Sequence, residues 1–288
     1  MTDTDLTLVS AWKGAQTRLK AANIDSPAID ARLLLEAATG FTRTDILTDP
    51  YKLLTVEQKT TLDDYLTRRE KRIPVARILG RKGFWKLLFT LSPHVLVPRP
   101  ETECIVDMIL KTTEEGQAFT LADLGVGSGA ILLSVLSERP AAKGLGTDVS
   151  EDALAVARDN AASLGLAGRA ALLRTSWAAG LEDASFDFVA SNPPYIRSDV
   201  IPTLDPEVRE HDPYLALDGG ESGLDAYEAM IPDAYRILKP GGTAWLEIGY
   251  DQSAAVEALM KKAGFFNVVT FKDLSDLPRI VIGQKIGF

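Results

Sequence analysis

The chain has 288 residues, 46% of them apolar and 25% charged, so it can form one large domain with a packed core and a second, smaller one. A formal net charge of −9 disfavours a protein that holds nucleic acid mainly through its phosphates. Cys104 is the single cysteine, which excludes a disulfide framework and a cysteine-rich metal site. The start, MTDTDLTLVS, lacks the apolar centre of a signal peptide, and no run reaches the ~18 apolar residues of a membrane helix, so we expect a cytoplasmic protein.

The pattern of residues 1–80 is helical throughout. Leu6 to Ala22 is amphipathic. Ser26-Pro27 then combines an N-cap residue with proline at the first helical position, and Gly40 ends that second helix. A Thr55–Gln58 capping-box pattern begins a third helix. No catalytic constellation stands out here, and the sequence predicts a helical domain over residues 1–80.

The third helix runs to about Arg72 and ends in a basic cluster. This cluster, Arg68 to Arg72, is followed by Arg77, Arg81 and Lys82. We interpret it as a solvated helix end whose positive charge complements the helix dipole. A partner-docking patch is the alternative.

A hairpin is expected to link this domain to the next. GFWKLLFTLSPHVLV, from Gly83 to Val97, alternates like two strands joined by a turn around Ser92-Pro93, which predicts a linker over residues 81–100. Over residues 101–288, short apolar strands then alternate with helical segments, which favours a doubly wound parallel sheet. The last two strands are separated only by LSDLP and are expected to pair as antiparallel neighbours.

The first candidate binding motif is DLGVGSGA, Asp123 to Ala130. A strand leads into glycines at 125, 127 and 129, which permit positive φ and the close approach of a ligand to the backbone. Asp148 ends the next strand and is suited to accept hydrogen bonds from ribose hydroxyls. A P-loop is excluded because its Lys-Ser/Thr pair is missing. The motif alone leaves open a dinucleotide, S-adenosylmethionine or a tight turn that binds nothing.

The second motif follows the strand FDFVAS, where the chain turns abruptly into Asn192-Pro193-Pro194-Tyr195. Proline cannot donate to a sheet ladder, so the strand must end there in a stiff turn. The Asn192 side-chain oxygen and the Pro193 carbonyl can each accept one N–H of an NH2 group, and Tyr195 offers a flat wall. Such a turn can aim the weak lone pair of a planar amide or amine nitrogen, which favours methyl transfer over hydride transfer.

With these motifs, the chain resembles the glutamine amide N-methyltransferases of peptide chain release factors, the HemK/PrmC family. The resemblance runs over nearly the whole length, in the blocks VLVPRPETE, DLGVGSGAILL, GTDVSEDALAVARDNA, FDFVASNPPYI, LALDGGESGLDAY, LKPGGTAWLEIG and KDLSDLPRIV. It implies a class I S-adenosylmethionine-dependent methyltransferase, with a Rossmann-like, mostly parallel seven-stranded sheet over residues 101–288. The helical domain would dock the protein substrate. The activity would be methylation of the glutamine in the Gly-Gly-Gln motif of class I release factors.

The resemblance also implies site residues. Those assigned to the cofactor are Gly125, Val126, Gly127, Ser128, Gly129, Asp148, Trp177 (beside adenine) and Asn192. Asn192, Pro193, Pro194 and Tyr195 would hold the substrate glutamine, with Asn192, Pro193 and Tyr195 catalytic. Two positions depart from the family pattern: Ser176 stands where an Asp usually partners the adenine amino group, and Asp212 where Glu-Pro is common.

Other readings of the same motifs stay open. A glutamine methyltransferase of a large-subunit ribosomal protein shares NPPY but resembles PRSPI where this chain has PRPET, Pro98 to Thr102. A nucleic-acid adenine methyltransferase also carries NPPY but needs a basic cleft and a recognition region, which fit the net charge poorly. A non-catalytic binding module is the third alternative. We expect no direct nucleic-acid binding, no membrane contact and a monomer.

A few further residues have two readings each. Glu247 ends a strand at the crevice side and either supports the pocket or is a buried structural acid. Glu101 and Thr102 either touch the cofactor or cap the following helix, with capping favoured. Phe89 lines the pocket or belongs to the core, and an aromatic in an alternating hairpin is more often core. The two histidines, at 94 and 211, are far apart in sequence, so no metal site is expected.

Overall fold

The computed structural model describes residues 6–273 and 275–287, and the chain divides into two compact units. One unit comprises the chain up to Gly80 together with the segment Pro206–His211. The other comprises Arg81–Asp205 and the chain from Asp212 onward. The first unit is therefore discontinuous in sequence, which the linear pattern did not predict.

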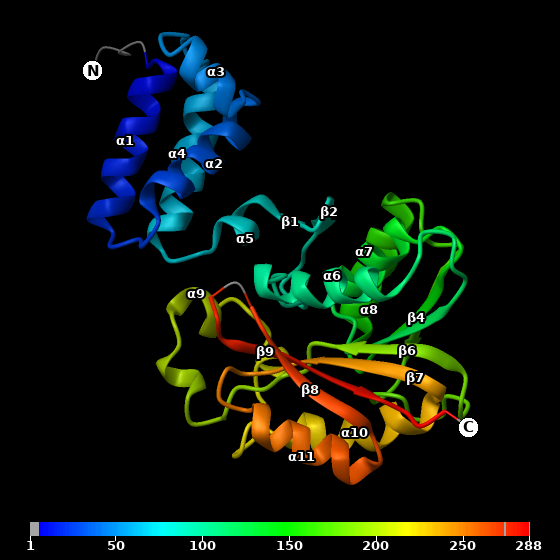
Figure 1. Ribbon diagram of the computed structural model, residues 1–288. Helices are drawn as coiled ribbons and strands as arrows, with labels where there is room; N and C mark the ends of the chain where they lie inside the picture. Colours follow the sequence, from blue (N-terminus) through cyan, green and yellow to red (C-terminus); the bar gives the residue numbers. More distant parts are fainter. Residues whose placement is uncertain (1–5, 274, 288) are drawn as a thin grey trace. The chain divides into compact units, whose positions relative to one another are not determined.

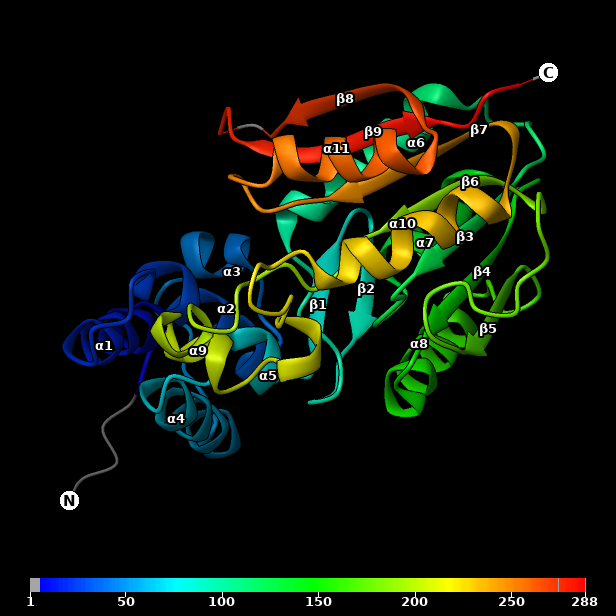
Figure 2. The same cartoon turned by 90° about the horizontal axis from the view of Figure 1, so that it is seen from below.

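The first unit is a helical bundle. Its helices are α1 (Leu8–Ala21), α2 (Pro27–Thr39), α3 (Arg43–Thr48), α4 (Val56–Glu70), α5 (Val75–Leu79) and, from the inserted segment, α9 (Pro206–Arg209), which Figure 2 shows beside them. Gly40 ends α2 with a φ of 74°, and Thr55 and Gln58 form the predicted capping box of α4. Ser26 occupies the N-cap position of α2, but its hydroxyl donates to Asp30 instead of capping. The predicted helices are confirmed; α3, α5 and α9 are additional.

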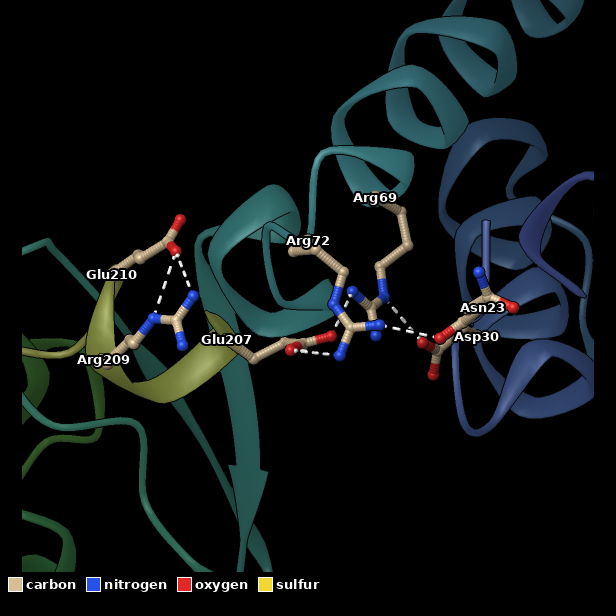
Figure 3. Close-up of polar contacts among 7 residues, drawn as sticks. All are labelled: Asn23, Asp30, Arg69, Arg72, Glu207, Arg209 and Glu210. Carbon is tan, nitrogen blue, oxygen red and sulfur yellow. Dashed lines mark hydrogen bonds and ion pairs between the residues drawn. The ribbon is translucent and has the colours of Figure 1, made fainter. Parts of the chain in front are cut away.

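The basic cluster at the end of α4 is largely paired, so its interpretation as a solvated helix end is wrong. Arg69 is 6% exposed and donates to Asp30 (2.7 Å) and to Glu207 of α9 (2.9 Å). Arg72 donates to the second oxygen of Glu207 at 2.8 Å and to the Asn23 carbonyl at 2.7 Å (Figure 3). Glu207 thus pairs with both arginines, although it lies 138 residues after Arg69 and 135 residues after Arg72.

The second unit begins with the expected hairpin, but its turn is not where the sequence pattern suggested. Strands β1 (Arg81–Phe84) and β2 (Leu87–Thr90) are joined at Trp85-Lys86, not at Ser92-Pro93. Trp85 adopts a φ of 55°, and its backbone and indole N–H groups donate to Glu103 (2.8 Å) and Glu138 (2.9 Å). These contacts pin the early turn. Phe84 and Phe89 then meet across the hairpin inside the core, as expected for Phe89.

Seven strands of the described chain form one sheet in the order β5-β4-β3-β6-β7-β9-β8. They are β3 (Thr120–Leu124), β4 (Lys143–Asp148), β5 (Ala170–Arg174), β6 (Phe186–Ser191), β7 (Leu238–Glu247), β8 (Phe266–Lys272) and β9 (Pro278–Gln284). All pairs from β5 to β7 are parallel, whereas β9 is antiparallel to both β7 and β8. The predicted mostly parallel sheet and its antiparallel end are confirmed.

Helices cover both faces of this sheet (Figure 1). α6 (Glu103–Thr112), α7 (Ala130–Glu138) and α8 (Glu151–Ser163) pack on one face, and α10 (Asp225–Ile237) and α11 (Ser253–Ala263) on the other. The short 3-10 turns are η1 (Pro100–Thr102), η2 (Ile201–Thr203) and η3 (Tyr214–Ala216). Strand order reverses between β3 and β6, and in doubly wound sheets ligands bind at the carboxyl ends of the strands at such a point. The glycine loop follows β3 and the NPPY turn follows β6.

Of the helices in the described residues, none is both long and apolar enough to cross a lipid bilayer.

Candidate active site

The glycine loop after β3 is tied to the end of β4. The N–H groups of Gly125 and Val126 both donate to the Thr147 carbonyl at 2.8 Å, and that of Gly127 donates to Asp148 Oδ2 at 3.0 Å. Gly129 has a φ of 86°, and a Cβ there would lie 2.8 Å from the Leu133 side chain. The loop therefore needs glycine for its conformation and for its packing against the start of α7.

Asp148 is held by backbone donors on both oxygens. Oδ2 accepts from Gly127, and Oδ1 accepts from the Ser150 N–H at 2.9 Å, just before α8 begins. A carboxylate has about four acceptor positions, so each oxygen keeps one for a hydroxyl of a bound ligand. The carboxylate is thus oriented in advance toward the space above the loop.

A pocket of about 260 Å³ opens above these groups, lined by residues from six segments of the second unit. It brings together these predicted site residues: Gly125, Val126, Gly127, Ser128, Asp148, Trp177, Asn192 and Pro194. Gly129, Pro193 and Tyr195 do not line it, although each is adjacent in sequence to a residue that does. The wall also includes Thr102, for which the sequence left a cofactor contact open, and Asp123 and Arg99, which the motifs did not single out as pocket residues.

Asp123 is the most unusual of the additional residues. It is 1% exposed, and Oδ2 accepts from the Leu132 N–H at 3.1 Å, whereas Oδ1 has no hydrogen-bond partner within residues 6–273 and 275–287. Burial raises the pKa of Asp123 to about 7, with a further contribution from Asp148. An unpartnered buried carboxyl oxygen that lines a pocket suits a cationic group such as an ammonium. Its place as the first residue of DLGVGSGA is the feature that could have indicated it.

Trp177 lines the pocket, and its neighbour Ser176 does not. Trp177 has a φ of 49°, in a turn closed by the Ala179 N–H and the Ser176 carbonyl at 2.9 Å. Ser176 itself is exposed, and Thr175 contributes to the wall instead. Ser176, where the family usually has Asp, therefore does not line the pocket. The flat indole of Trp177 stays available for stacking.

The NPPY turn is anchored from behind by several side chains. Asn192 Nδ2 donates to Thr102 Oγ1 at 3.0 Å, and the Tyr195 hydroxyl donates to Glu247 Oε1 at 3.4 Å. Gln252 Nε2 donates to the Tyr195 carbonyl at 3.0 Å. Burial raises the pKa of Tyr195, so its hydroxyl stays protonated. Thr102 occupies the N-cap position of α6 without any side-chain capping bond, so the favoured capping role is wrong for Thr102.

The block LALDGGESGLDAY packs directly against this turn. A Cβ at Gly219 would lie 2.9 Å from the Tyr195 Cα, and one at Gly223 would lie 2.7 Å from the Tyr195 carbonyl oxygen. Gly223 also has a φ of 75°. The two glycines allow a backbone-to-backbone approach that no larger residue permits, and so explain why this distant block accompanies NPPY.

Asp212, the second departure, pairs with Arg99 at the pocket wall. Its Oδ2 accepts from Arg99 at 2.5 Å and its Oδ1 from the Val97 N–H at 3.3 Å. The Asp212 side chain is 1% exposed. Asp212 thus supplies an acidic side chain at this position, in an ion pair that fixes the segment before η1.

The groups that line the pocket fit S-adenosylmethionine. Asp148 offers acceptors to ribose hydroxyls, Trp177 a face to adenine, and the orphaned oxygen of Asp123 an acceptor to an amino group. Within residues 6–273 and 275–287, no cluster of three or more His, Cys, Asp or Glu side chains is arranged to hold a metal ion. A doubly wound sheet with β9 antiparallel, a glycine loop after β3 and an acid after β4 define a class I S-adenosylmethionine-dependent methyltransferase.

Comparison with known proteins narrows this class. Two family models match: the PrmC N-terminal domain over residues 10–80 and the methyltransferase small domain over residues 102–203. A release factor glutamine methyltransferase of Caulobacter vibrioides is 61% identical over 280 residues, 97% of each chain. One of Bradyrhizobium diazoefficiens is 44% identical over 98% of this chain and 96% of the relative. The chain therefore belongs to the release factor glutamine methyltransferase family, and its cofactor is S-adenosylmethionine.

A solved structure adds support for the fold alone. A methyltransferase from Pyrococcus furiosus is 21% identical, with a TM-score of 0.52 over 69% of this chain and 89% of that one. The predicted fold class, the enzyme class and the cofactor are confirmed by these comparisons.

Proposed function

We propose that this enzyme methylates the side-chain amide nitrogen of the glutamine in the Gly-Gly-Gln motif of class I release factors. The observation that carries the proposal is that Asn192 and Pro194 line the same pocket as the glycine loop and Asp148. Because the Nδ2 of Asn192 is used by Thr102, its Oδ1 is the atom left to accept an N–H from a substrate. The relatives of this chain that are named release factor glutamine methyltransferase support the same substrate.

In this proposal the side chains position the substrate, and bound S-adenosylmethionine supplies an electrophilic methyl group on a sulfonium. Asn192 Oδ1 and the Pro193 carbonyl hold the two N–H bonds of the target amide, so its lone pair is aimed at the methyl carbon. Tyr195 bounds the planar amide from one side. Gly125–Gly129 cradle the methionine part of the cofactor, and Asp148 accepts from its ribose hydroxyls. The role of Trp177 is to stack on adenine.

The test is a comparison of acceptors with labelled S-adenosylmethionine. A class I release factor, the same factor with its Gly-Gly-Gln glutamine replaced by alanine, a large-subunit ribosomal protein and duplex DNA are offered to the purified enzyme. Label should enter only the intact release factor. Transfer to the ribosomal protein or to DNA, without transfer to the release factor, would replace this proposal by one of the two alternatives.

We propose that the helical unit docks the release factor. Four large apolar side chains within ten residues of chain are exposed there: Leu47 (64%), Tyr51 (78%), Leu53 (51%) and Val56 (61%). An exposed apolar cluster of this kind is typical of a protein contact surface. Tyr51→Ser combined with Leu53→Ser should raise the KM for intact release factor at least tenfold, yet leave methylation of a short Gly-Gly-Gln peptide unchanged.

The matched control for this docking surface is Val269→Ser, at an exposed apolar position on β8 (51%) in the other unit. It should change neither KM. Equal KM values for release factor in the wild type and the Tyr51/Leu53 variant would contradict the docking role. We further propose that the enzyme is a cytoplasmic monomer that does not bind nucleic acid. Sedimentation of the pure protein, alone and with RNA, would test the oligomeric state and the lack of nucleic-acid binding.

A further inference from the structure

The pocket includes the carboxyl ends of three adjacent strands, β3, β4 and β5. The glycine loop follows β3, Asp148 ends β4, and Thr175 comes directly after β5. In the parallel pair of β4 and β5, Asp148 lies opposite Arg174, the residue before Thr175. A cofactor with its methionine part at the glycine loop and its ribose at Asp148 therefore brings its base to the end of β5.

Two hydrogen bonds hold Thr175 at this strand end. Its backbone N–H donates to the Asp148 carbonyl at 3.0 Å, and its hydroxyl donates to the Ala179 carbonyl at 2.9 Å. The second bond spans the turn in which Trp177 has its φ of 49°. Thr175 and Trp177 both line the pocket. One short turn thus contributes an indole and a hydroxyl-bearing residue to the same part of the wall.

The bond to Ala179 decides what kind of ligand group Thr175 can pair with. A threonine hydroxyl has one proton and two lone pairs. Because the proton is donated to a carbonyl of the chain, the oxygen is left to accept from a ligand. The exocyclic amino group of adenine is a donor, whereas an oxo group at the same place on a purine is an acceptor. Thr175 therefore complements adenine and opposes hypoxanthine.

Two neighbouring hydroxyls are less suited to this task. Ser150 lines the pocket, and its Oγ accepts from the Ala153 N–H at 3.2 Å, so its proton is the group that remains to be donated. Ser176 is exposed and does not line the pocket. An acceptor for an amino group is thus better supplied by Thr175 than by either serine.

We propose that the Thr175 hydroxyl oxygen accepts a hydrogen bond from the adenine amino group of S-adenosylmethionine. Thr175 would then do what the family pattern assigns to an Asp at the position of Ser176. A neutral hydroxyl accepts less strongly than a carboxylate, so this contact selects the base more than it tightens binding. The inference rests on the proposed placement of adenine against Trp177, and it adds a residue that distinguishes one purine from another.

The test measures the binding of two ligands by calorimetry, in the absence of release factor. One is S-adenosylhomocysteine, the product that remains after methyl transfer, and the other is S-inosylhomocysteine, in which hypoxanthine replaces adenine. The wild type should bind the adenosyl ligand at least about tenfold more tightly, because an acceptor facing an oxo group leaves both unpaired. In Thr175→Val this preference should fall about threefold to tenfold, whereas Thr175→Ser, which keeps the hydroxyl, should retain it.

The comparison of two ligands separates recognition of the base from damage to the turn. Valine also removes the bond to the Ala179 carbonyl, and a loosened turn would weaken both ligands equally and leave the preference unchanged. Thr203→Val is the matched control. The Thr203 hydroxyl donates to the Val200 carbonyl at 2.7 Å in a turn whose threonine does not line the pocket. This substitution should change the affinity for neither ligand.

Three results would overturn the assignment of Thr175. The first is an unchanged preference in Thr175→Val, whether or not both ligands bind more weakly. The second is a preference that is lost in Ser150→Ala and kept in Thr175→Val, which would give the amino group to Ser150. The third is a wild type that binds the two ligands equally.

Trp177→Ala tests the placement of adenine separately. It should weaken both ligands, because stacking on the indole does not depend on the group at position 6 of the purine. If Trp177→Ala changes neither affinity, the proposed placement of adenine fails. If it weakens both ligands and Thr175→Val keeps the preference, only the assignment of Thr175 fails.

Discussion

Replacement of Glu207 by glutamine should loosen the helical unit, although residue 207 lies far outside its main stretch of sequence. Glu207 accepts from Arg69 with one oxygen (2.9 Å) and from Arg72 with the other (2.8 Å), as Figure 3 shows. Glutamine keeps the size and one acceptor oxygen but loses the charge that both arginines share. The pairs hold α9 to the end of α4, so their loss should be felt in that helix and in α2.

The magnitude follows from burial and from what remains paired. Removing one partner of a fully buried ion pair costs about 3–5 kcal/mol, and an exposed pair is worth about 0–1 kcal/mol. The side chains of Arg69 and Glu207 are 7% and 18% exposed, which is close to the buried limit. Arg69, however, keeps its 2.7 Å bond to Asp30. We therefore expect a loss of about 2 kcal/mol in the free energy of opening the helical unit.

The pH dependence of this loss has a definite sign. Burial would raise the pKa of Glu207, but its hydrogen bonds, including those from Arg69 and Arg72, outweigh burial and lower it. A lowered pKa in the folded state means that the stabilisation is complete above the ordinary glutamate pKa of about 4.5 and disappears as the pH falls through the lowered value. The difference between wild type and Glu207→Gln should be full at pH 7 and shrink in acid below about pH 4.

Hydrogen exchange of the backbone amides of α2 and α4 at pH 7 measures this opening directly. Glu210→Gln is the matched control, because Glu210 lies on the same segment and pairs with its neighbour Arg209 at the surface, 52% and 38% exposed. It should leave exchange unchanged. Equal exchange rates in the two variants, or exchange unchanged from the wild type in both, would refute the view that Glu207 is part of the helical unit.

Three more outcomes are expected at the active site. Asp148→Ala should weaken S-adenosylmethionine binding by about tenfold to a hundredfold, since a hydrogen bond to a charged group contributes about 1.5–3 kcal/mol; an unchanged dissociation constant in calorimetry would rule out the ribose role. Asn192→Ala should lower turnover on a release factor about a hundredfold to a thousandfold with cofactor affinity within tenfold, and a wild-type rate would contradict the proposed role of Asn192 in holding the substrate amide. Gly219→Ala should destabilise the fold by about 1–3 kcal/mol and slow methylation, because its Cβ would lie 2.9 Å from the Tyr195 Cα. Gly168→Ala, whose Cβ meets nothing within 4 Å, is its control in thermal unfolding, and equal melting temperatures would contradict the packing argument.

The elements that the sequence predicted are those determined by near neighbours. The capping box of Thr55 and Gln58 and the glycine end of α2 act over three or four residues, so their residue types are sufficient. The strands of the parallel sheet were also predictable, because each is a short apolar run of neighbouring residues. The NPPY turn was recognisable because two prolines after a strand permit few conformations.

What the sequence did not predict depends on partners far along the chain. Arg69 looks like a solvated cation until Glu207, 138 residues later, is placed beside it. Thr102 looks like a helix cap in the sequence, but in the structure its hydroxyl oxygen accepts from Asn192, which lies 90 residues later. The turn of the hairpin was misplaced because Trp85, an unusual residue for positive φ, is held there by Glu103 and Glu138. In each case the deciding contact is tertiary.

The discontinuous helical unit has a consequence for how the protein is made. A ribosome adds about 5–20 residues per second, so Glu207 follows Arg72, 135 residues earlier, by roughly 7–27 s. During that interval the five N-terminal helices are complete in sequence, but Arg72 has no Glu207 to pair with and Arg69 has only Asp30. Glu207, which pairs with Arg69 and Arg72 of the helical unit, is therefore synthesised as part of an insertion in the second unit, after the NPPY turn.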